Sequence, residues 1–213
     1  GTSLATTDFS YLEDPNNTAP YQPFDELKRI HIGDCLRLDI GGEYRNRYHV
    51  EKNMRLTGEY NEFDLSRVRI YSDLWYGDVF RIYLEYIDGV SLGEEVTPRS
   101  IDENRSDLLQ LFTDVKVGEP CGRPLYLRFG RQELFYGSER LMSSPDWSNV
   151  RRPFEGAKLF WKGEAWDADA FWARPDVPVD PHNFDSPDQE RQLSGLLSTY
   201  HGMDDHTIDL YYL

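Results

Sequence analysis

Arginine recurs at alternate positions in two stretches of this chain, and this spacing is the pattern best suited to binding chemistry. Arg45 and Arg47 lie in YRNRY, and Arg67 and Arg69 lie in SRVRI. In a β-strand, residues two apart point to the same face. Each pair would therefore present two guanidinium groups side by side, and their forked geometry suits carboxylates. Such an arginine ladder would offer replaceable contacts to a hydrated anionic substrate.

The segments that carry these arginines alternate apolar and polar residues, which is typical of strands whose two faces meet different surroundings. Residues 36–50 place Leu36, Leu38 and Ile40 on one face and Arg37 and Asp39 on the other. A helix is the main rival only for residues 107–117, because DLLQLF also fits a helical period. The alternation predicts about nine strands, at residues 36–50, 63–75, 79–87, 107–117, 125–134, 157–161, 165–173, 192–200 and 206–213.

The connections between these strands alternate between long and short. The long ones are residues 51–62, 88–105, 133–153 and 174–191, and the short ones are residues 76–78, 118–124, 162–164 and 201–205. An up-and-down antiparallel transmembrane β-barrel has this pattern, because tight turns lie on one side of the membrane and long loops on the other. A soluble Greek-key sandwich gives no reason for it. We therefore predict an all-β barrel, with the soluble sandwich as the alternative.

The domain organisation follows from the same pattern. Residues 1–30 lack periodicity and contain Pro15, Pro20 and Pro23, so we expect an irregular, mostly solvated tail. Residues 31–213 should form the barrel strands. Bacterial single-chain barrels have even strand numbers, so an odd count that ends on a strand at Leu213 predicts a chain truncated at its C-terminus. Residues 174–191 hold four prolines and are predicted to be a loop.

Composition limits the classes of function. The net charge of -15 argues against a nucleic-acid binder, because a phosphate backbone requires a basic surface. The mean hydropathy of -0.66 excludes a membrane helix but is compatible with a barrel, whose lumen-facing residues are polar. Aromatic residues make up 14% of the chain. Several aromatic residues lie near strand ends, where they could form an interfacial girdle or stack on sugars. They are Trp75, Tyr76, Trp161, Trp166 and Trp172.

The polar faces of the predicted strands carry charges of both signs. The inward cations are Arg37, Arg45, Arg47, Arg67, Arg69, Arg81, Lys116, Arg128 and Lys158. The inward carboxylates are Asp39, Glu43, Asp73, Glu85, Asp114, Asp167, Asp169 and Asp209. One interpretation is a positive stripe that carries an anion, favoured by the arginines of the first two strands. The other is that the charges pair across strands and hold the wall together.

No enzyme signature is present: there is no GxSxG, HExxH, phosphate-binding Gly-rich loop or CxxC. Cys35 and Cys121 lack metal-ligand spacing and are interpreted as two unrelated thiols. The segment HGMDDH, with His201, Asp204, Asp205 and His206, has groups that chelate metals but is interpreted as a turn. We therefore predict that the protein is not an enzyme and needs no cofactor or metal.

Residues 128–159, RFGRQELFYGSERLMSSPDWSNVRRPFEGAKL, resemble the signature region of the alginate export porin family. The shared features are a GRQ strand end, a G-x-x-R-L segment and a DWSN-x-x-R-x-F-x-G-A segment. The resemblance also takes in DLLQLFTDVKV and, more loosely, YRNRY and RVRIYSDLWYGDVF, so that it covers most of residues 36–172. The last two strands are generic.

This resemblance implies the N-terminal half of an outer-membrane barrel of roughly eighteen strands, through which an anionic polyuronate leaves the periplasm passively. The implied partners are anionic polysaccharide, outer-membrane lipid and periplasmic export components. The alternatives are a nonselective porin or sugar-uptake channel, and a soluble carbohydrate-binding sandwich. The long loop of residues 133–153 could fold into the pore or cap it. The candidate pathway residues are Arg45, Arg47, Arg67, Arg69, Arg81, Arg128, Arg131 and Lys158.

Arg131 fits the alternation poorly. It shares parity with Phe129, which the pattern places on the outward face. Either a bulge turns Arg131 inward or it faces the membrane interface.

Overall fold

The computed structural model describes residues 3–54, 56, 58–137, 139, 142–177 and 183–213. The nine predicted strands are all present, and the described part of the chain adds two short ones, β1 and β9. The bounds are β1 Ile30–Ile32, β2 Leu36–Lys52, β3 Tyr60–Tyr76, β4 Phe80–Leu92, β5 Asn104–Gly118, β6 Leu125–Gln132, β7 Phe154–Lys162, β8 Trp166–Val177, β9 Ser186–Pro187, β10 Leu193–Met203 and β11 His206–Tyr212.

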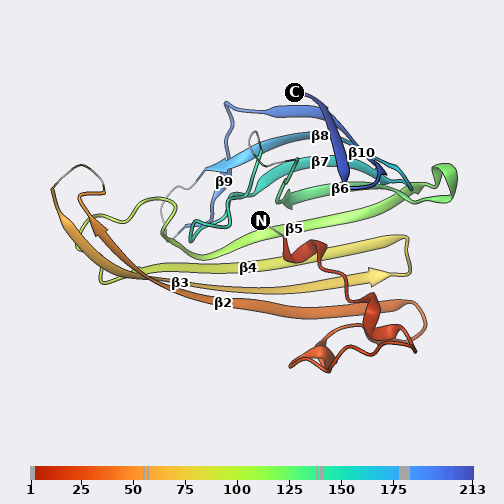
Figure 1. Ribbon diagram of the computed structural model, residues 1–213, viewed down its shortest axis with the longest axis horizontal. Coiled ribbons are helices and arrows are strands. Elements are labelled where there is room, and N and C mark those ends of the chain that lie inside the picture. Colours follow the sequence, from red (N-terminus) through yellow and green to blue (C-terminus); the bar gives the residue numbers. More distant parts are fainter. Residues whose placement is uncertain (1–2, 55, 57, 138, 140–141, 178–182) are drawn as a thin grey trace.

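The strands form one large antiparallel sheet in which each long strand pairs with the next along the chain (Figure 1). The order is β1-β2-β3-β4-β5-β6-β7-β8-β10-β11, and β9 pairs with β8. The predicted up-and-down antiparallel order and the alternation of long and short connections are confirmed. Closure into a barrel is not present, because β1 and β11 form the two edges of the described sheet. The sandwich alternative is wrong, since a sandwich requires two packed sheets.

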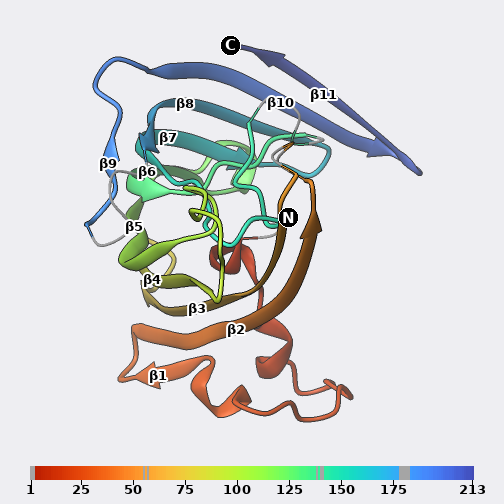
Figure 2. The same ribbon diagram turned by 90° about the vertical axis from the view of Figure 1, so that its left-hand side faces the viewer.

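The sheet curls into a trough that is open on the side between β2 and β11 (Figure 2). Its concave face buries charged and polar side chains, including Arg67, Arg69 and Glu85. Its convex face exposes large apolar side chains such as Ile70, at 52%, and Phe129, at 54%. This arrangement is the reverse of a soluble sheet protein, whose buried face is apolar. The alternation therefore assigned the two faces correctly.

Two glycines let neighbouring strands approach closely in the middle of the sheet. Gly130 of β6 and Gly156 of β7 are register partners. A Cβ atom on Gly130 would collide with the Leu111 carbonyl of β5, and Gly130 also has a positive φ of 120°. A Cβ atom on Gly156 would collide with the carbonyl of Trp172 in β8. Only glycine fits both positions.

The structure confirms the predicted strand in β5 and corrects the face assigned to Leu109. The helix rival is wrong, because residues 104–118 form a strand with partners on both sides. The pairing skips from Glu85–Gln110 to Tyr86–Leu108, which is a bulge at Leu109. Leu109 therefore becomes buried, with 2% exposure, although simple alternation places it outward.

The structure also corrects the loop predicted at residues 174–191. β8 continues to Val177, and β9 pairs with it through Asp176–Pro187 and Val177–Ser186. A proline lacks the N–H donor but keeps its carbonyl, so it is tolerated at an edge. The Pro175 carbonyl accepts a hydrogen bond from the Asp188 N–H at 2.9 Å.

Most described residues of the N-terminal tail are exposed. It contains three 3₁₀ helices, Leu4–Thr6, Ser10–Glu13 and Asp25–Leu27. Ser3 and Ala5 are buried in the trough, where Ala5 packs with Tyr71 and Tyr83. Much of the remainder is exposed, as expected. Among the described residues, every helix falls short of the length and apolarity needed to span a membrane.

Candidate functional site

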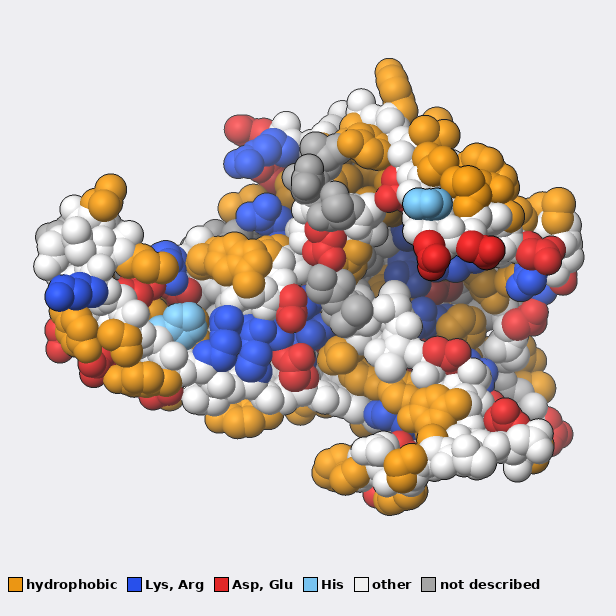
Figure 3. All heavy atoms as spheres, viewed as in Figure 1, with side chains coloured by type: hydrophobic (Ala, Val, Ile, Leu, Met, Phe, Trp, Pro, Cys, Tyr) orange, Lys and Arg blue, Asp and Glu red, His pale blue; other side chains and the backbone are white. Residues whose placement is uncertain are grey.

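Arg45 and Arg47 lie on the concave face of β2, and Arg45 is the register partner of Arg67 in β3. Like charges directly across a strand pair repel each other. The structure places the Asp146 carboxylate near both, 3.7 Å from Arg45 Nη1 and 3.2 Å from Arg67 Nη2. Asp146 belongs to the connection of residues 133–153, so this connection folds into the trough. Figure 3 shows basic side chains gathered on this face of the molecule.

Arg45 and Arg47 are held by neutral backbone carbonyls of the same connection. Arg45 Nη1 donates to the Asp146 carbonyl at 2.6 Å, and Arg45 Nη2 donates to the Ser148 carbonyl. Arg47 Nη1 donates to the Trp147 carbonyl at 2.5 Å. Nε of both arginines and Nη2 of Arg47 have no hydrogen-bond partner among the described residues. A carboxylate ligand would bind guanidinium more strongly than a carbonyl does, because both groups are then charged.

Arg67 and Arg69 belong to a buried ion-pair network instead. Arg67 Nε donates to Glu43 Oε1 at 3.0 Å, and its side chain is fully buried. Arg69 Nε donates to Glu85 Oε1 at 2.5 Å, and Arg69 Nη2 lies 3.9 Å from Glu133. These two arginines fix strands β2, β3 and β4 to one another.

Three further predicted cations of the concave face are also paired with carboxylates. Arg81 donates to both oxygens of Asp73 at 2.7 and 2.8 Å. Arg128 binds both oxygens of Asp114 at 2.6 and 2.8 Å. Lys158 lies 2.7 Å from Asp169. The interpretation that charges pair across strands therefore holds for these residues. Arg45 and Arg47 differ from them because they donate hydrogen bonds to backbone carbonyls.

Arg131 lies on the other face of the sheet from this group. It is the register partner of Leu111 and Glu155, on the same side as the exposed Phe129. Its guanidinium donates to Glu155 at 2.8 Å and contacts Asp176 at 2.9 Å. No bulge turns it inward, so the structure separates Arg131 from the other seven predicted site residues.

Asn149 anchors the connection to the trough and was not singled out from the sequence as a functional residue. Its Nδ2 donates to the Ser66 carbonyl at 3.0 Å and to the Asp102 carbonyl at 3.0 Å, and the side chain is fully buried. Asn149 is the last residue of the DWSN segment that carried the family resemblance. That segment was the available signal, but the backbone carbonyls that Asn149 binds are not apparent from the sequence.

The N-terminal segment Ser3–Thr6 enters the trough beside the connection. Arg81 Nη2 donates to the Ala5 carbonyl at 2.7 Å. Gln110 Nε2 lies within hydrogen-bond distance of Ser3 Oγ, at 3.1 Å, and of Glu133 Oε2, at 3.3 Å. Gln110 thus links the N-terminal segment to the connection.

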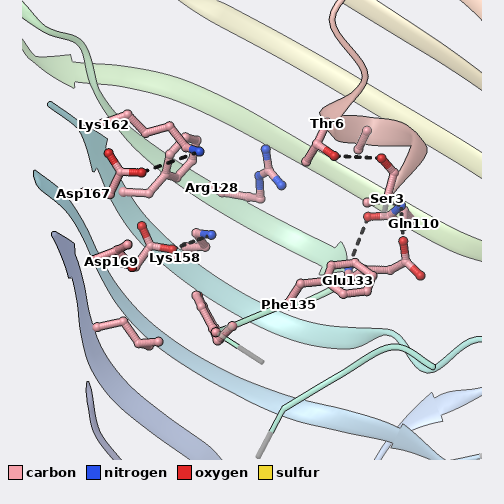
Figure 4. Close-up of a pocket in the computed structure, with 16 residues that line it drawn as sticks. Ser3, Thr6, Gln110, Arg128, Glu133, Phe135, Lys158, Lys162, Asp167 and Asp169 are labelled. Carbon is pink, nitrogen blue, oxygen red and sulfur yellow. Dashed lines mark hydrogen bonds and ion pairs between the residues drawn. The ribbon is translucent and has the colours of Figure 1, made fainter. Parts of the chain in front are cut away.

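A cavity of about 270 Å³ lies between these two segments and the strands β5 to β8 and β10 (Figure 4). Phe135, Tyr136 and Phe160 form its apolar walls. Its charged lining consists of Arg128, Lys158, Lys162, Glu133, Asp167 and Asp169.

The N-terminal segment should be displaced by overpacking. Ala5→Trp adds a large ring where Ala5 packs against Tyr71 and Tyr83, at a cost of about 1–3 kcal/mol. We expect the segment to leave the trough, and the single-channel conductance of the whole protein in planar bilayers to rise. Ala19→Trp, at an exposed position of the same tail, is the matched control and should leave conductance unchanged. Equal conductance in both variants would contradict a docked segment.

Asp146 should make the connection sensitive to acid. Burial opposes its charge, but Arg151 and Arg67 outweigh burial and hold the pKa of Asp146 below its ordinary 3.8. A lowered pKa means that the stabilisation is complete above the ordinary pKa and is lost as pH falls through the lower folded value. We expect hydrogen exchange of residues 146–149, corrected for intrinsic rates, to accelerate at acid pH. In Asp146→Asn the exchange should already be fast near neutral pH, and a persistent acid dependence would contradict this assignment.

The structure brings no group of three or more His, Cys, Asp and Glu side chains into metal-binding proximity within its described residues. Cys35 and Cys121 are both exposed and free, in agreement with two unrelated thiols.

The class of protein is an all-β protein with a large up-and-down antiparallel sheet, apolar on its convex face and charged on its concave face. The model of the alginate export family matches residues 36–213, so the chain belongs to the alginate export family. This is a family of outer-membrane porins, which transport and do not catalyse. The chain matches no curated protein and no solved structure.

Proposed function

We propose that this chain forms part of an outer-membrane channel for the passive export of an anionic polysaccharide of the alginate-like polyuronate type. Arg45 and Arg47 carry the proposal, together with membership of the family. Their guanidinium groups face the trough and are held by backbone carbonyls of residues 146–148. A uronate carboxylate can replace a carbonyl with a gain in electrostatic energy, and then move on to the next guanidinium.

The convex face supports a membrane location. Soluble monomers rarely expose large contiguous apolar patches, yet this face exposes apolar side chains from β2 to β11. Those with the highest exposure include Tyr44, Tyr48, Ile70, Phe129, Leu196, Leu210 and Tyr212. Outer-membrane lipid is the proposed partner of this face. An open edge in hydrocarbon costs several kcal/mol per unpaired backbone group, so the proposal includes closure of the sheet into a barrel of roughly eighteen strands.

The roles of the eight candidate residues differ in this proposal. Arg45 and Arg47 exchange their carbonyl ligands for substrate carboxylates. The paired cations Arg67, Arg69, Arg81, Arg128 and Lys158 hold the wall of the pathway, and Arg131 stabilises the convex face. Periplasmic export components would deliver the polymer to the end with the tight turns.

A nonselective porin or sugar-uptake channel is the second candidate. The observation that favours it is the pairing of most concave-face cations with carboxylates, which lowers the net positive potential of the trough. This candidate requires the two β2 arginines to have little influence on which ions pass.

Single-channel recording of the whole protein in planar bilayers tests the proposal. Polyuronate added to the side of the tight turns should reduce the current, because it occupies the arginine-lined path. If polyuronate leaves the current unchanged while a neutral glucan blocks it, anion export is wrong. Block by polyuronate that persists when Arg45 and Arg47 are both changed to Ser would favour the nonselective channel.

A further inference from the structure

The cavity of Figure 4 differs in its electrostatics from the path along β2. Three cations, Arg128, Lys158 and Lys162, face it, together with three carboxylates. The lining therefore carries no net charge. The cavity is lined by strands β5 to β8 and β10, whereas Arg45 and Arg47 belong to β2. Figure 2 shows β2 on the opposite side of the trough from β7 and β8.

Each cation of the cavity already has a carboxylate partner. Lys158 lies 2.7 Å from Asp169, and Lys162 lies 3.9 Å from Asp167. Arg128 projects into the cavity and binds Asp114 through both of its oxygens. An entering anion would have to displace one of these carboxylates and would then lie beside the others. Juxtaposed like charges cost several kcal/mol, so the cavity disfavours a uronate.

The same groups suit an uncharged ligand that carries hydroxyl groups. Ion-paired carboxylates retain free lone pairs that accept from hydroxyls, and Lys and Arg retain N–H groups that donate. The hydroxyls of Ser3, Thr6 and Thr199 add further partners around the rim. None of these contacts requires an existing ion pair to break.

The walls supply an apolar surface beside these polar groups. The Phe160 ring stacks on Tyr126 with centroids 5.6 Å apart, and the Tyr136 ring stacks on Phe171 at 5.3 Å. These partners fix both rings in place, and Phe135 lies nearby in the lining. A rigid aromatic wall with a few convergent polar groups is the usual composition of a small-molecule site. At about 270 Å³ the cavity is just below the usual range for drug-sized ligands, which fits a single sugar ring.

We propose that this cavity is a binding site for one uncharged pyranose residue, separate from the anionic path on β2. The apolar face of the sugar ring packs on Phe160, and its hydroxyls bind the Lys158–Asp169 and Lys162–Asp167 pairs. The ligand is a free neutral sugar or one residue of a neutral oligosaccharide. The inference goes beyond the proposed function and does not depend on passage of a polyuronate.

Single-channel recording of the whole protein distinguishes this site from the β2 path. The probes are a neutral gluco-oligosaccharide, an oligouronate of the same length and free glucose. We expect the neutral oligosaccharide to interrupt the current, and Phe160→Leu to shorten these interruptions by about tenfold. Leucine keeps an apolar side chain but removes the ring, together with its stacking on Tyr126. Phe24→Leu makes the same change at an exposed ring of the N-terminal tail that does not line the cavity, and should leave the interruptions unchanged.

A second variant tests the charge balance. Asp167→Asn gives the lining a net positive charge, so oligouronate interruptions should lengthen and neutral ones should shorten. Competition by free glucose would show that a single sugar suffices, and its failure to compete would show that the site needs a residue within a chain. Absence of neutral interruptions, or neutral interruptions that Phe160→Leu leaves unaltered, would overturn the proposal. The proposed function depends instead on polyuronate block of the unaltered protein, so the two fail separately.

Discussion

Arg69→Met is expected to destabilise the whole protein by about 3–5 kcal/mol, because it removes one partner of a buried ion pair. Arg69 and Glu85 are both almost completely buried and lie 2.5 Å apart. Without the guanidinium, the hydrogen-bond partners that the Glu85 carboxylate keeps among the described residues are Tyr83 and Gln110, at 2.9 and 2.8 Å. Two neutral donors do not offset the desolvation of a charge at this depth. Urea unfolding of the protein refolded into lipid vesicles measures the loss.

Arg47→Met is the matched control, since it makes the same chemical change one strand away. Within the described part of the chain, Arg47→Met removes one hydrogen bond, to the Trp147 carbonyl, which is worth about 1 kcal/mol. The double variant Arg69→Met with Glu85→Gln removes both charges and should recover a large part of the loss. Equal destabilisation by Arg69→Met and Arg47→Met would show that the buried pair has no special role.

The sequence predicted the strands and their faces well because both depend on local information. A strand exposed to lipid on one side and to polar groups on the other must alternate apolar and polar residues. The faces of Ile70 and Arg69 can therefore be assigned from residue type alone, without knowing which residues they contact. The order of the strands followed from connection length, since a tight turn can only join neighbours. The sequence also showed that Arg131 does not fit the alternation, because it lies two residues from Phe129 and so shares its outward face. The structure places Arg131 on that outward face.

The contacts that the sequence could not predict join residues far apart in the chain. Arg45 binds the carbonyl of Asp146, 101 residues later, and Arg81 binds the carbonyl of Ala5, 76 residues earlier. A backbone carbonyl is present at every residue, so side-chain type gives no sign of which one an arginine will bind. The bulge at Leu109 is equally hidden, because one extra residue in a strand leaves the composition unchanged. The sequence could therefore name the cations but could not separate those that bind backbone carbonyls from those that pair with carboxylates.

Arg45 and Arg47, the two β2 arginines that bind backbone carbonyls, are expected to set the ion selectivity. Arg45→Gln with Arg47→Gln should reduce the preference of the channel for anions by roughly tenfold, because the local field of two guanidinium groups is lost. The stability should change little, since neither residue is bound mainly by a carboxylate: Arg47 has a carbonyl partner, and Arg45 is 3.7 Å from Asp146. The reversal potential across a salt gradient measures the permeability ratio of anion to cation.

Two further variants give this experiment its control. Lys162→Gln and Lys116→Gln together remove the same formal charge from the trough, but at cations that carboxylates already neutralise. Removing a neutralised cation exposes its carboxylate, so the control also lowers the net charge by two while leaving the β2 arginines intact. If selectivity follows total charge, both double variants shift the reversal potential equally. If selectivity resides in guanidinium groups that exchange carbonyls for carboxylates, only the β2 variant should also abolish polyuronate block, because only it removes the groups that the polymer binds.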